Sequence, residues 1–147
     1  MAQQIPGEPR GIRAVALCAL ERNGEYLVFE AWDPVKQRAF RRFAGGGIEP
    51  GETAEQAVRR EMLEELETGL ESVRLLGVLE NIFEHEGKPG HEIVFLFAAN
   101  ATNAEVYASD ELVFVEGPEL VPARWIAKAY LNDGAEFVPP GALELLL

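Results

Sequence analysis

The feature that most constrains the fold of this chain is a helix with recognisable signals at both ends. Thr53 and Gln56 have the spacing of a capping box, in which each side chain satisfies a backbone N–H of the first turn. No Gly or Pro follows before Gly69, so the sequence predicts a helix from Thr53 to about Thr68 that stops at Gly69. Its apolar stripe consists of Ala54, Val58, Met62 and Leu66. This stripe needs a second layer to pack against.

Strand-like segments lie on both sides of this helix. Residues 12–20 and 26–31 are apolar and flank Asn23-Gly24, a dipeptide typical of tight hairpin turns. Further strands are predicted at 73–83 and 92–99, joined by a longer loop over 85–90, and more weakly at 111–115 and 124–126, with a short helix at 126–132. Because the strands bracket the main helix instead of alternating with helices, the predicted fold class is α+β, with a mixed sheet packed against helices.

Length and charge limit the domain organisation and the partners. The 147 residues predict one domain over 1–147, with 1–10 as a flexible N-terminal segment. A formal net charge of −12 repels phosphate backbones and anionic membranes, so neither a DNA or RNA duplex nor a membrane is an expected partner. The apolar runs fall far short of the roughly 20 residues of a membrane span. A single cysteine, Cys18, is expected in the core, which suits a cytoplasmic protein.

Three glutamates of the predicted helix form an acidic cluster. Glu61, Glu64 and Glu65 are spaced i, i+3 and i+4, so their carboxylates project from one side of the helix. Like charges at this spacing destabilise a helix by about 0.2–0.5 kcal/mol per pair. A solvated acidic face is the simplest interpretation. The alternative is a site for a divalent cation such as Mg²⁺, which prefers oxygen ligands and commonly joins carboxylates to a substrate phosphate.

The order of the motifs favours the cation site. Gly46, Glu52 six residues later and the run Arg60-Glu61-Met62-Leu63-Glu64-Glu65 resemble the box of the Nudix hydrolase family, G-x5-E-x7-R-E-U-x-E-E-x-G-U, where U is aliphatic. The box expects Gly and an aliphatic residue where this chain has Glu67 and Thr68. Gly69-Leu70 follows two residues late, which we interpret as a two-residue insertion that lengthens the helix. Ala44 replaces the Pro that commonly precedes the glycines.

The resemblance implies a fold and a reaction. The fold is a Nudix-like α/β/α sandwich, with the mixed sheet between helices. The reaction is an attack of water on a phosphorus of a diphosphate linked to another moiety, usually a nucleoside derivative. The cofactor is Mg²⁺, for which Mn²⁺ is an alternative, and the partner is a small-molecule diphosphate. Nudix hydrolases of ADP-ribose, diadenosine polyphosphates and NADH carry characteristic residues downstream of the box, and this chain lacks them. Their absence favours a nucleoside tri- or diphosphate type of substrate.

The resemblance also assigns roles to residues of the box. The expected catalytic residues are Arg60, Glu61, Glu64 and Glu65. The three glutamates are expected to ligate the metal, and one of them to orient or deprotonate water. The backbones of Gly45 and Gly46 are expected to approach metal or phosphate. Glu52 is expected to pair with Arg60 or to act as a further ligand.

Residues outside the box complete the predicted site. A further metal ligand is expected at Glu119, with Glu116 and Glu111 as alternatives. Substrate phosphate is expected at Arg41 or Arg42, within a basic stretch that also contains Lys36 and Arg38. Two interpretations apply to Phe83 and Trp32, which either stack on a base or pack in the core. Trp125 is expected in the core. His85 and His91 are expected in an exposed loop.

The sequence leaves two alternative functions open and also allows a homodimer. The rival functions are hydrolysis of a non-nucleotide diphosphate, such as an isoprenoid or inositol compound, and nucleotide sensing without catalysis. Intact Glu61, Glu64 and Glu65 argue against a pure sensor. The apolar C-terminal residues Leu143, Leu145, Leu146 and Leu147 are expected to dock on the core or on a second subunit, so a homodimer is one expectation.

Overall fold

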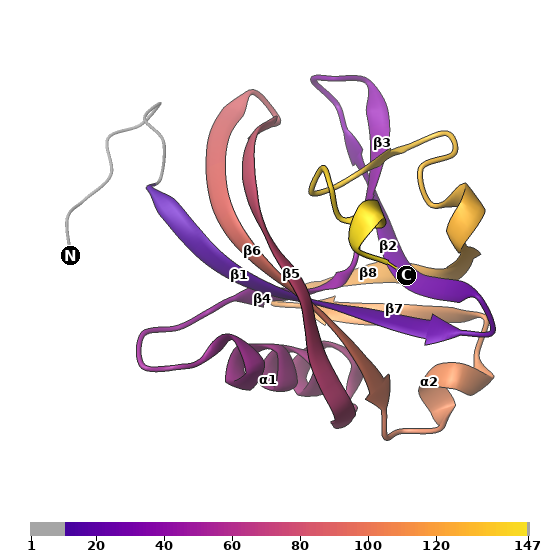
Figure 1. Cartoon of the computed structure of the whole chain (residues 1–147). Helices are drawn as coiled ribbons and strands as arrows, with labels where there is room; N and C mark the ends of the chain where they lie inside the picture. The colour runs from indigo at the N-terminus through magenta and orange to yellow at the C-terminus, as the bar shows by residue number, and fades with distance from the viewer. Residues whose placement is uncertain (1–10, 147) are drawn as a thin grey trace.

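The computed structural model describes residues 11–146 (Figure 1). The predicted N-terminal segment 1–10 and Leu147 lie outside the described residues. The strands are β1 (Ile12–Arg22), β2 (Glu25–Asp33), β3 (Arg38–Arg42), β4 (Ala44–Gly47), β5 (Leu70–His85), β6 (Lys88–Ala101), β7 (Glu111–Glu116), β8 (Glu119–Ala127) and β9 (Glu136–Phe137). The helices are α1 (Ala54–Leu66), α2 (Glu105–Ala108) and the 3₁₀ turns η1 (Lys128–Tyr130) and η2 (Leu143–Leu145). The predicted α+β class is confirmed.

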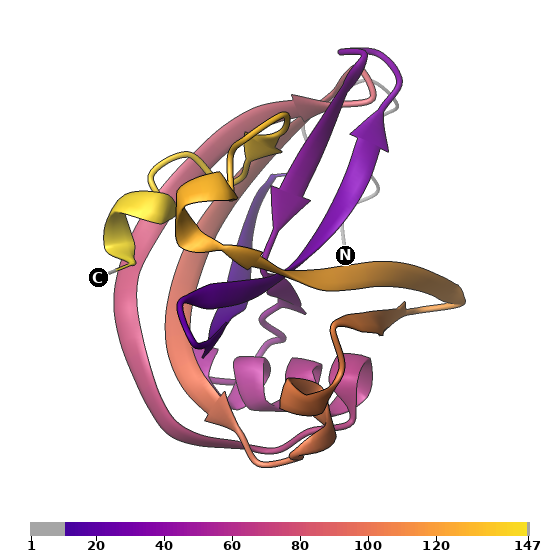
Figure 2. The same ribbon diagram turned by 90° about the vertical axis from the view of Figure 1, so that its right-hand side faces the viewer.

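The sheet is mixed, as predicted, and it splits into two parts that share β1. One part has the order β5-β6-β1-β4, in which β6 runs parallel to β1 and the other pairs are antiparallel. The other part has the order β7-β8-β2-β3-β9, in which only β3 and β9 are parallel. The end of β1 pairs with β2 and joins the two parts. Figure 2 shows the β2–β3 and β5–β6 hairpins extending away from α1 on the same side.

Two tight turns set the lengths of the hairpins. Asn23 and Gly24 have φ of 49° and 82°, the left-handed pair that a two-residue hairpin turn requires. This confirms the predicted first hairpin. Glu86 and Gly87 repeat the arrangement at φ of 53° and 79°, and pairing continues up to His85 and Lys88. The predicted loop over 85–90 was therefore too long, because most of its residues belong to the strands.

The two faces of the sheet are covered differently. Helix α1 buries Ala57, Val58 and Met62 against one face. On the opposite face the C-terminal segment packs Leu131, Phe137 and Leu146 onto the first part of the sheet. This second layer contains only the 3₁₀ turns η1 and η2 where α-helix was expected, and η1 replaces the predicted helix at 126–132. None of the helices in residues 11–146 is long and apolar enough to cross a bilayer.

Several core expectations are confirmed. Cys18 is 1% exposed, and burial raises the pKa of its thiol to about 12. Trp125 is buried, and its indole N–H donates to the carbonyl of Ser109. Among the C-terminal leucines, Leu143, Leu145 and Leu146 pack on the core of their own chain.

Helix α1 begins as predicted and ends earlier. The Gln56 N–H donates to Thr53 Oγ1 at 3.1 Å, and the Thr53 N–H donates to Gln56 Oε1 at 2.8 Å, which completes the capping box. The helix ends at Leu66, and Glu67 closes it with a left-handed φ of 53°. Glu67 therefore takes the position of the glycine in the Nudix box, and the buried Thr68 takes the position of the aliphatic residue. The predicted stop at Gly69 is wrong, and the left-handed Glu67 at the glycine position of the box argues against the interpretation of a two-residue insertion.

The left-handed Glu67 is expected to cost stability. A residue with a Cβ loses about 1 kcal/mol in this conformation relative to glycine. The substitution Glu67→Gly should therefore raise the free energy of unfolding by about 1 kcal/mol in urea titrations. Glu67→Ala is the matched control, because it removes the same exposed carboxylate but keeps the Cβ, and it should not stabilise. Equal stability of the two variants would contradict the strain argument.

Candidate active site

A small cavity of about 250 Å³ lies between α1, β4, β1 and the end of β7. Its walls include Glu61, Glu64, Glu65, Glu116, Arg13 and the three glycines of β4. We call it the glutamate cavity. The structure thus brings the three helix carboxylates and the glycine backbone together, as the sequence predicted.

The glycines of β4 are required by close packing. Gly45 has φ of 146°, and a Cβ there would collide with the carbonyl oxygen of Ala16 in β1. A Cβ at Gly46 would come within 2.6 Å of Glu61 Oε1. Gly45 therefore permits pairing with β1, and Gly46 lets the Glu61 carboxylate lie directly against the strand backbone. A larger residue at either position would push α1 and the sheet apart.

Arg60 fixes the helix to the preceding loop. Its guanidinium donates two hydrogen bonds to the Glu52 carboxylate, at 2.7 and 2.9 Å, and a third to the Gly47 carbonyl oxygen at 2.9 Å. It also donates to Glu61 Oε1 at 2.9 Å and to Glu64 Oε2 at 3.4 Å. The Arg60 hydrogen bonds, followed by the N–H of Glu49, lower the pKa of Glu52 to about 2. This geometry agrees with the expected pairing of Glu52 and Arg60.

The three helix carboxylates have different surroundings. Glu65 is only 5% exposed, and burial together with the adjacent Glu61 raises the pKa of its carboxyl to about 9. The charge of Glu116 acts in the same direction, and that of Arg42 opposes it. The Glu64 side chain is 59% exposed, and that of Glu61 is 16% exposed. Burial and the neighbouring Glu61 therefore disfavour the ionised form of Glu65, whereas Glu64 is largely open to solvent.

The donor chemistry fits a hard divalent cation. Within residues 11–146, no group of three or more His, Cys, Asp or Glu side chains is already gathered in the geometry of a metal centre. However, the carboxyls of Glu61 and Glu65 lie close enough to hydrogen-bond, and the partly exposed Glu64 is in reach of solvent. Carboxylate oxygens are the ligands that Mg²⁺ and Mn²⁺ prefer. A divalent cation would favour the ionised form of Glu65, which burial and the neighbouring Glu61 now disfavour.

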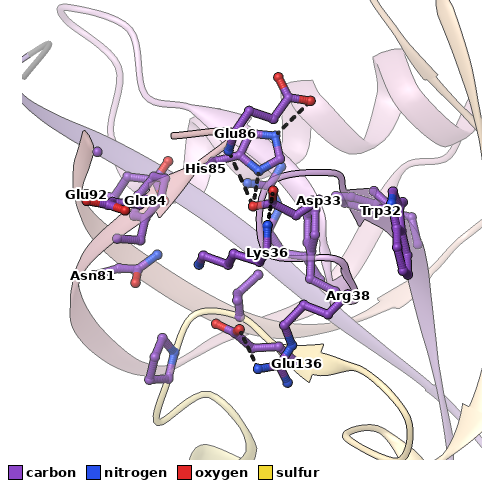
Figure 3. A pocket seen from close by; sticks show the side chains of 18 of the residues that line it. Trp32, Asp33, Lys36, Arg38, Asn81, Glu84, His85, Glu86, Glu92 and Glu136 are labelled. Carbon is purple, nitrogen blue, oxygen red and sulfur yellow. Dashed lines mark hydrogen bonds and ion pairs between the residues drawn. The ribbon is translucent and has the colours of Figure 1, made fainter. Parts of the chain in front are cut away.

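A second cavity, of about 980 Å³, lies between the β2–β3 and β5–β6 hairpins (Figure 3). We call it the large cavity. Its lining includes the substrate-binding candidates Trp32, Lys36, Arg38, Arg42 and Phe83. It also includes Glu119, which was expected as a metal ligand, and His85 and His91, which were expected in an exposed loop. Glu116 lines both cavities, so the two adjoin at the end of β7.

Arg41 and Arg42 point to different places because neighbours in a strand alternate. Arg41 is buried and donates to Glu30 at 2.8 Å and to the backbone carbonyls of residues 130, 131 and 133. It lines neither cavity, which speaks against the prediction that it binds substrate phosphate. Arg41 instead holds the C-terminal segment on the sheet. Arg42 lines the large cavity, stacks on Phe29 and lies 4.0 Å from Glu116.

The aromatic and histidine residues also differ in part from expectation. Trp32 is 57% exposed at the large cavity, so its predicted core packing is wrong. Phe83 is half-buried and packs over Gly90, where a Cβ would collide with its ring. His85 lies at a strand end, 3.6 Å from Asp33, and His91 lies within β6.

The three candidates for an additional metal-binding carboxylate lie in different places relative to the two cavities. Glu116 lines the glutamate cavity, and its charge raises the pKa of Glu65. Glu119 lies opposite Glu116 on β8 and lines only the large cavity. Glu111 is exposed at the far end of β7 and lines neither. Of the three, Glu116 is the one placed beside the helix carboxylates, because it lines the glutamate cavity and Glu119 does not.

Sequence reasoning missed three residues of the cavities. Arg13 lines the glutamate cavity, and the buried Asn81 and Glu92 line the large cavity. The available signal was the presence of polar residues inside otherwise apolar strands. That signal does not say which face of the sheet will be uncovered.

Comparison with solved structures supports the fold. The chain is similar to a MutT NUDIX hydrolase from Burkholderia pseudomallei, with 24% identity, a TM-score of 0.65 and coverage of 94% of this chain and 100% of that chain. It is also similar to a NUDIX hydrolase from Nitrosomonas europaea, with 20% identity, a TM-score of 0.63 and coverage of 90% and 84%. A MutT protein from Bacillus halodurans matches at 20% identity and a TM-score of 0.60, with coverage of 84% and 74%. At these identities the likeness shows the fold alone.

Comparison of the sequence itself identifies the family. No curated protein matches the chain in a sequence search. The family model described as NUDIX domain matches residues 10–142, which is nearly the whole chain and includes both cavities. The box residues, their spacing and the match agree, and this chain belongs to the NUDIX family.

Proposed function

We propose that this protein is a Mg²⁺-dependent pyrophosphohydrolase that cleaves a nucleotide-type diphosphate linked to another moiety. Membership in the NUDIX family supports a hydrolase of phosphoric anhydrides. The observation that carries the proposal is the glutamate cavity, in which Glu61, Glu64 and Glu65 face the glycine backbone of β4 and Arg60 holds the helix in place. The adjoining large cavity offers space for the group attached to the diphosphate.

The proposed reaction needs positioning, charge neutralisation and an activated water. The water oxygen forms a bond to one phosphorus, the bond from that phosphorus to the bridging oxygen breaks, and the leaving phosphate keeps the electron pair. Bound Mg²⁺ would neutralise phosphate charge and lower the pKa of the water. Glu61, Glu64 and Glu65 would hold the ion, and one of these carboxylates would accept the proton of the water. Arg60 acts as a positioning residue through its contacts with Glu61 and Glu64.

Substrate binding is proposed for groups around the two cavities. Arg42 and the backbone near Gly46 would approach phosphate, and Gly45 keeps the strand close enough for this approach. Phe83 would contact the attached moiety in the large cavity. Hydrolysis of a panel of nucleotides, nucleotide sugars and isoprenoid diphosphates with Mg²⁺ or Mn²⁺ tests this function. Tight binding without turnover would favour a sensor, and turnover of isoprenoid diphosphates alone would favour a non-nucleotide hydrolase.

The helix carboxylates should be needed for turnover and for metal binding. Glu64→Gln and Glu65→Gln each remove a charge at nearly constant volume, so kcat should fall by about 10²-fold or more. The rise in Tm that Mg²⁺ gives the wild-type protein should shrink in the same variants. Glu55→Gln is the matched control, because Glu55 lies on the same helix but pairs only with the exposed Arg59. Near-normal turnover of both variants at limiting Mg²⁺ would refute the assigned role.

The two acids of the β7–β8 hairpin should behave differently. Glu116 lines the glutamate cavity and Glu119 does not, so Glu116→Gln should weaken Mg²⁺ binding about 10-fold and Glu119→Gln by less than about 2-fold. Calorimetric titration of Mg²⁺ measures both. A larger effect at Glu119 would restore the original sequence-based preference.

The Glu52–Arg60 pair should contribute stability that depends on pH. Because the folded pKa of Glu52 is lowered to about 2, the contribution is fully present above the unfolded pKa and is lost as the pH falls through 2. Glu52→Gln should therefore lower Tm near neutral pH, and the difference from wild type should shrink between pH of about 4.5 and about 2. Glu49→Gln, in the same loop, serves as the control. A difference in Tm that is independent of pH would show that the charge of Glu52 is not responsible.

A further inference from the structure

A row of three polar residues crosses three neighbouring strands. Arg13 on β1 is in register with Glu92 on β6, which is in register with Asn81 on β5. Residues directly opposite one another in a sheet share a face, so the three side chains lie on one side of the sheet. The row that follows toward the core, Val15, Val94 and Leu79, is apolar. The polar row therefore marks the border where the core ends and the cavities begin.

Two members of this row are buried without good partners. Asn81 is 7% exposed and Glu92 is 8% exposed. Among residues 11–146, the only ion-pair partner of Glu92 is Arg13, at the long distance of 4.0 Å. The fully buried side-chain atoms without a hydrogen bond in this range are Arg42 Nε and His91 Nε2, so the polar atoms of Asn81 and Glu92 keep some exposure toward the cavity. These polar atoms are therefore available to a ligand or water that completes their hydrogen bonds inside a largely buried wall. Both side chains line the large cavity, and Figure 3 shows them on its β5–β6 wall, opposite Trp32 and Arg38.

The row also connects the two cavities. Arg13 lines the glutamate cavity, where its guanidinium lies over Gly47 so closely that a Cβ there would come within 2.8 Å of Nη2. Glu92 and Asn81 line the large cavity. Neighbouring strands are about 4.8 Å apart, so the Cα atoms of Arg13 and Asn81 lie about 10 Å apart across the sheet. The row therefore reaches from the glutamate cavity into the large cavity.

Resting on the proposed function, we propose that the row Arg13–Glu92–Asn81 selects the substrate by the moiety attached to its diphosphate. Arg13 pairs with a phosphate oxygen, and Glu92 and Asn81 hydrogen-bond a neutral group that carries several N–H or O–H donors. An ionised carboxylate only accepts hydrogen bonds and repels phosphate, whereas a carboxamide both accepts and donates. The amino edge of a nucleobase and the adjacent hydroxyls of a sugar both present such donors.

The same chemistry excludes one class of substrate. An isoprenoid diphosphate would place hydrocarbon against Glu92 and Asn81 and leave both without hydrogen bonds. A site built to hydrogen-bond its ligand strongly rejects analogues that lack the polar groups. The row therefore favours nucleotides or nucleotide sugars over apolar diphosphates.

Binding of ligands that cannot be hydrolysed tests this inference. The ligands are α,β-methylene-GDP, the α,β-methylene analogue of ADP-ribose, and methylenebisphosphonate, which has no attached moiety. Titration calorimetry with Mg²⁺ compares wild type with Glu92→Gln, which removes the charge and keeps the shape. Glu80→Gln is the matched control, since Glu80 is exposed on the same hairpin and lines neither cavity. Asn81→Asp, which loses the amide donors, supplies a second variant if Glu92→Gln unfolds.

We expect at least one of the two ligands with an attached moiety to bind wild type about 10-fold more tightly than methylenebisphosphonate does. Glu92→Gln should remove this gain in affinity, while its Kd for methylenebisphosphonate should stay within about 2-fold of the wild-type value. The ligand that loses affinity distinguishes base from sugar recognition. Arg13→Gln should weaken all three ligands. The inference is overturned if the moiety gives no gain, if the gain survives in Glu92→Gln and Asn81→Asp, or if Glu92→Gln weakens all ligands equally. Because binding requires no turnover, binding as expected without hydrolysis of the parent substrates would overturn only the proposed function.

Discussion

The arrangement of the site depends on the guanidinium of Arg60. One planar group binds Glu52 through two hydrogen bonds, the Gly47 carbonyl oxygen and two glutamates of its own helix. A loop, a strand and a helix are thereby fixed relative to one another by a residue that stays charged at any physiological pH. Without this contact the acidic side of α1 would repel the acidic loop before it. The glycines of β4 then allow the helix to lie close enough for Glu61 to contact the strand backbone.

Charge is distributed so that an acidic protein can hold an anionic ligand. The net charge of −12 opposes phosphate at long range, but positive groups are placed locally. Arg13 lies at the glutamate cavity, and Lys36, Arg38 and Arg42 lie at the large cavity. Burial, followed by the neighbouring Glu61, raises the pKa of Glu65, and a divalent cation would favour its ionised form. The proposed metal and the local arginines would therefore both reduce the repulsion between the acidic protein and an anionic ligand.

Particular elements show how far sequence reasoning reached. The capping box of α1 and the Asn23-Gly24 turn were predicted correctly because each is a local arrangement of a few adjacent residues. The end of α1 was predicted wrongly because glycine was taken as the required stop, whereas Glu67 takes the left-handed conformation and its N–H donates back to the carbonyl of Leu63. The position of Glu116 relative to Glu119 could not be foreseen from the sequence for a related reason. Both are acids in one hairpin, and only the position of that hairpin against α1 separates them.

The sequence alone determined the helix with its acidic side, the glycine strand before it and the family to which the chain belongs, because these depend on residue types at fixed short spacings. Only the tertiary structure decided which positive side chains face the cavities. Arg41 and Arg42 are adjacent in sequence, yet the alternation of β3 directs Arg41 to the C-terminal segment and Arg42 to the large cavity. Similarly, Arg13, Glu92 and Asn81 are distant in sequence, and the register of three strands brings them into one row. The turn at Glu86-Gly87 fixes the pairing of Asn81 with Glu92, but the parallel pairing of β6 with β1, which adds Arg13, joins strands far apart in the sequence.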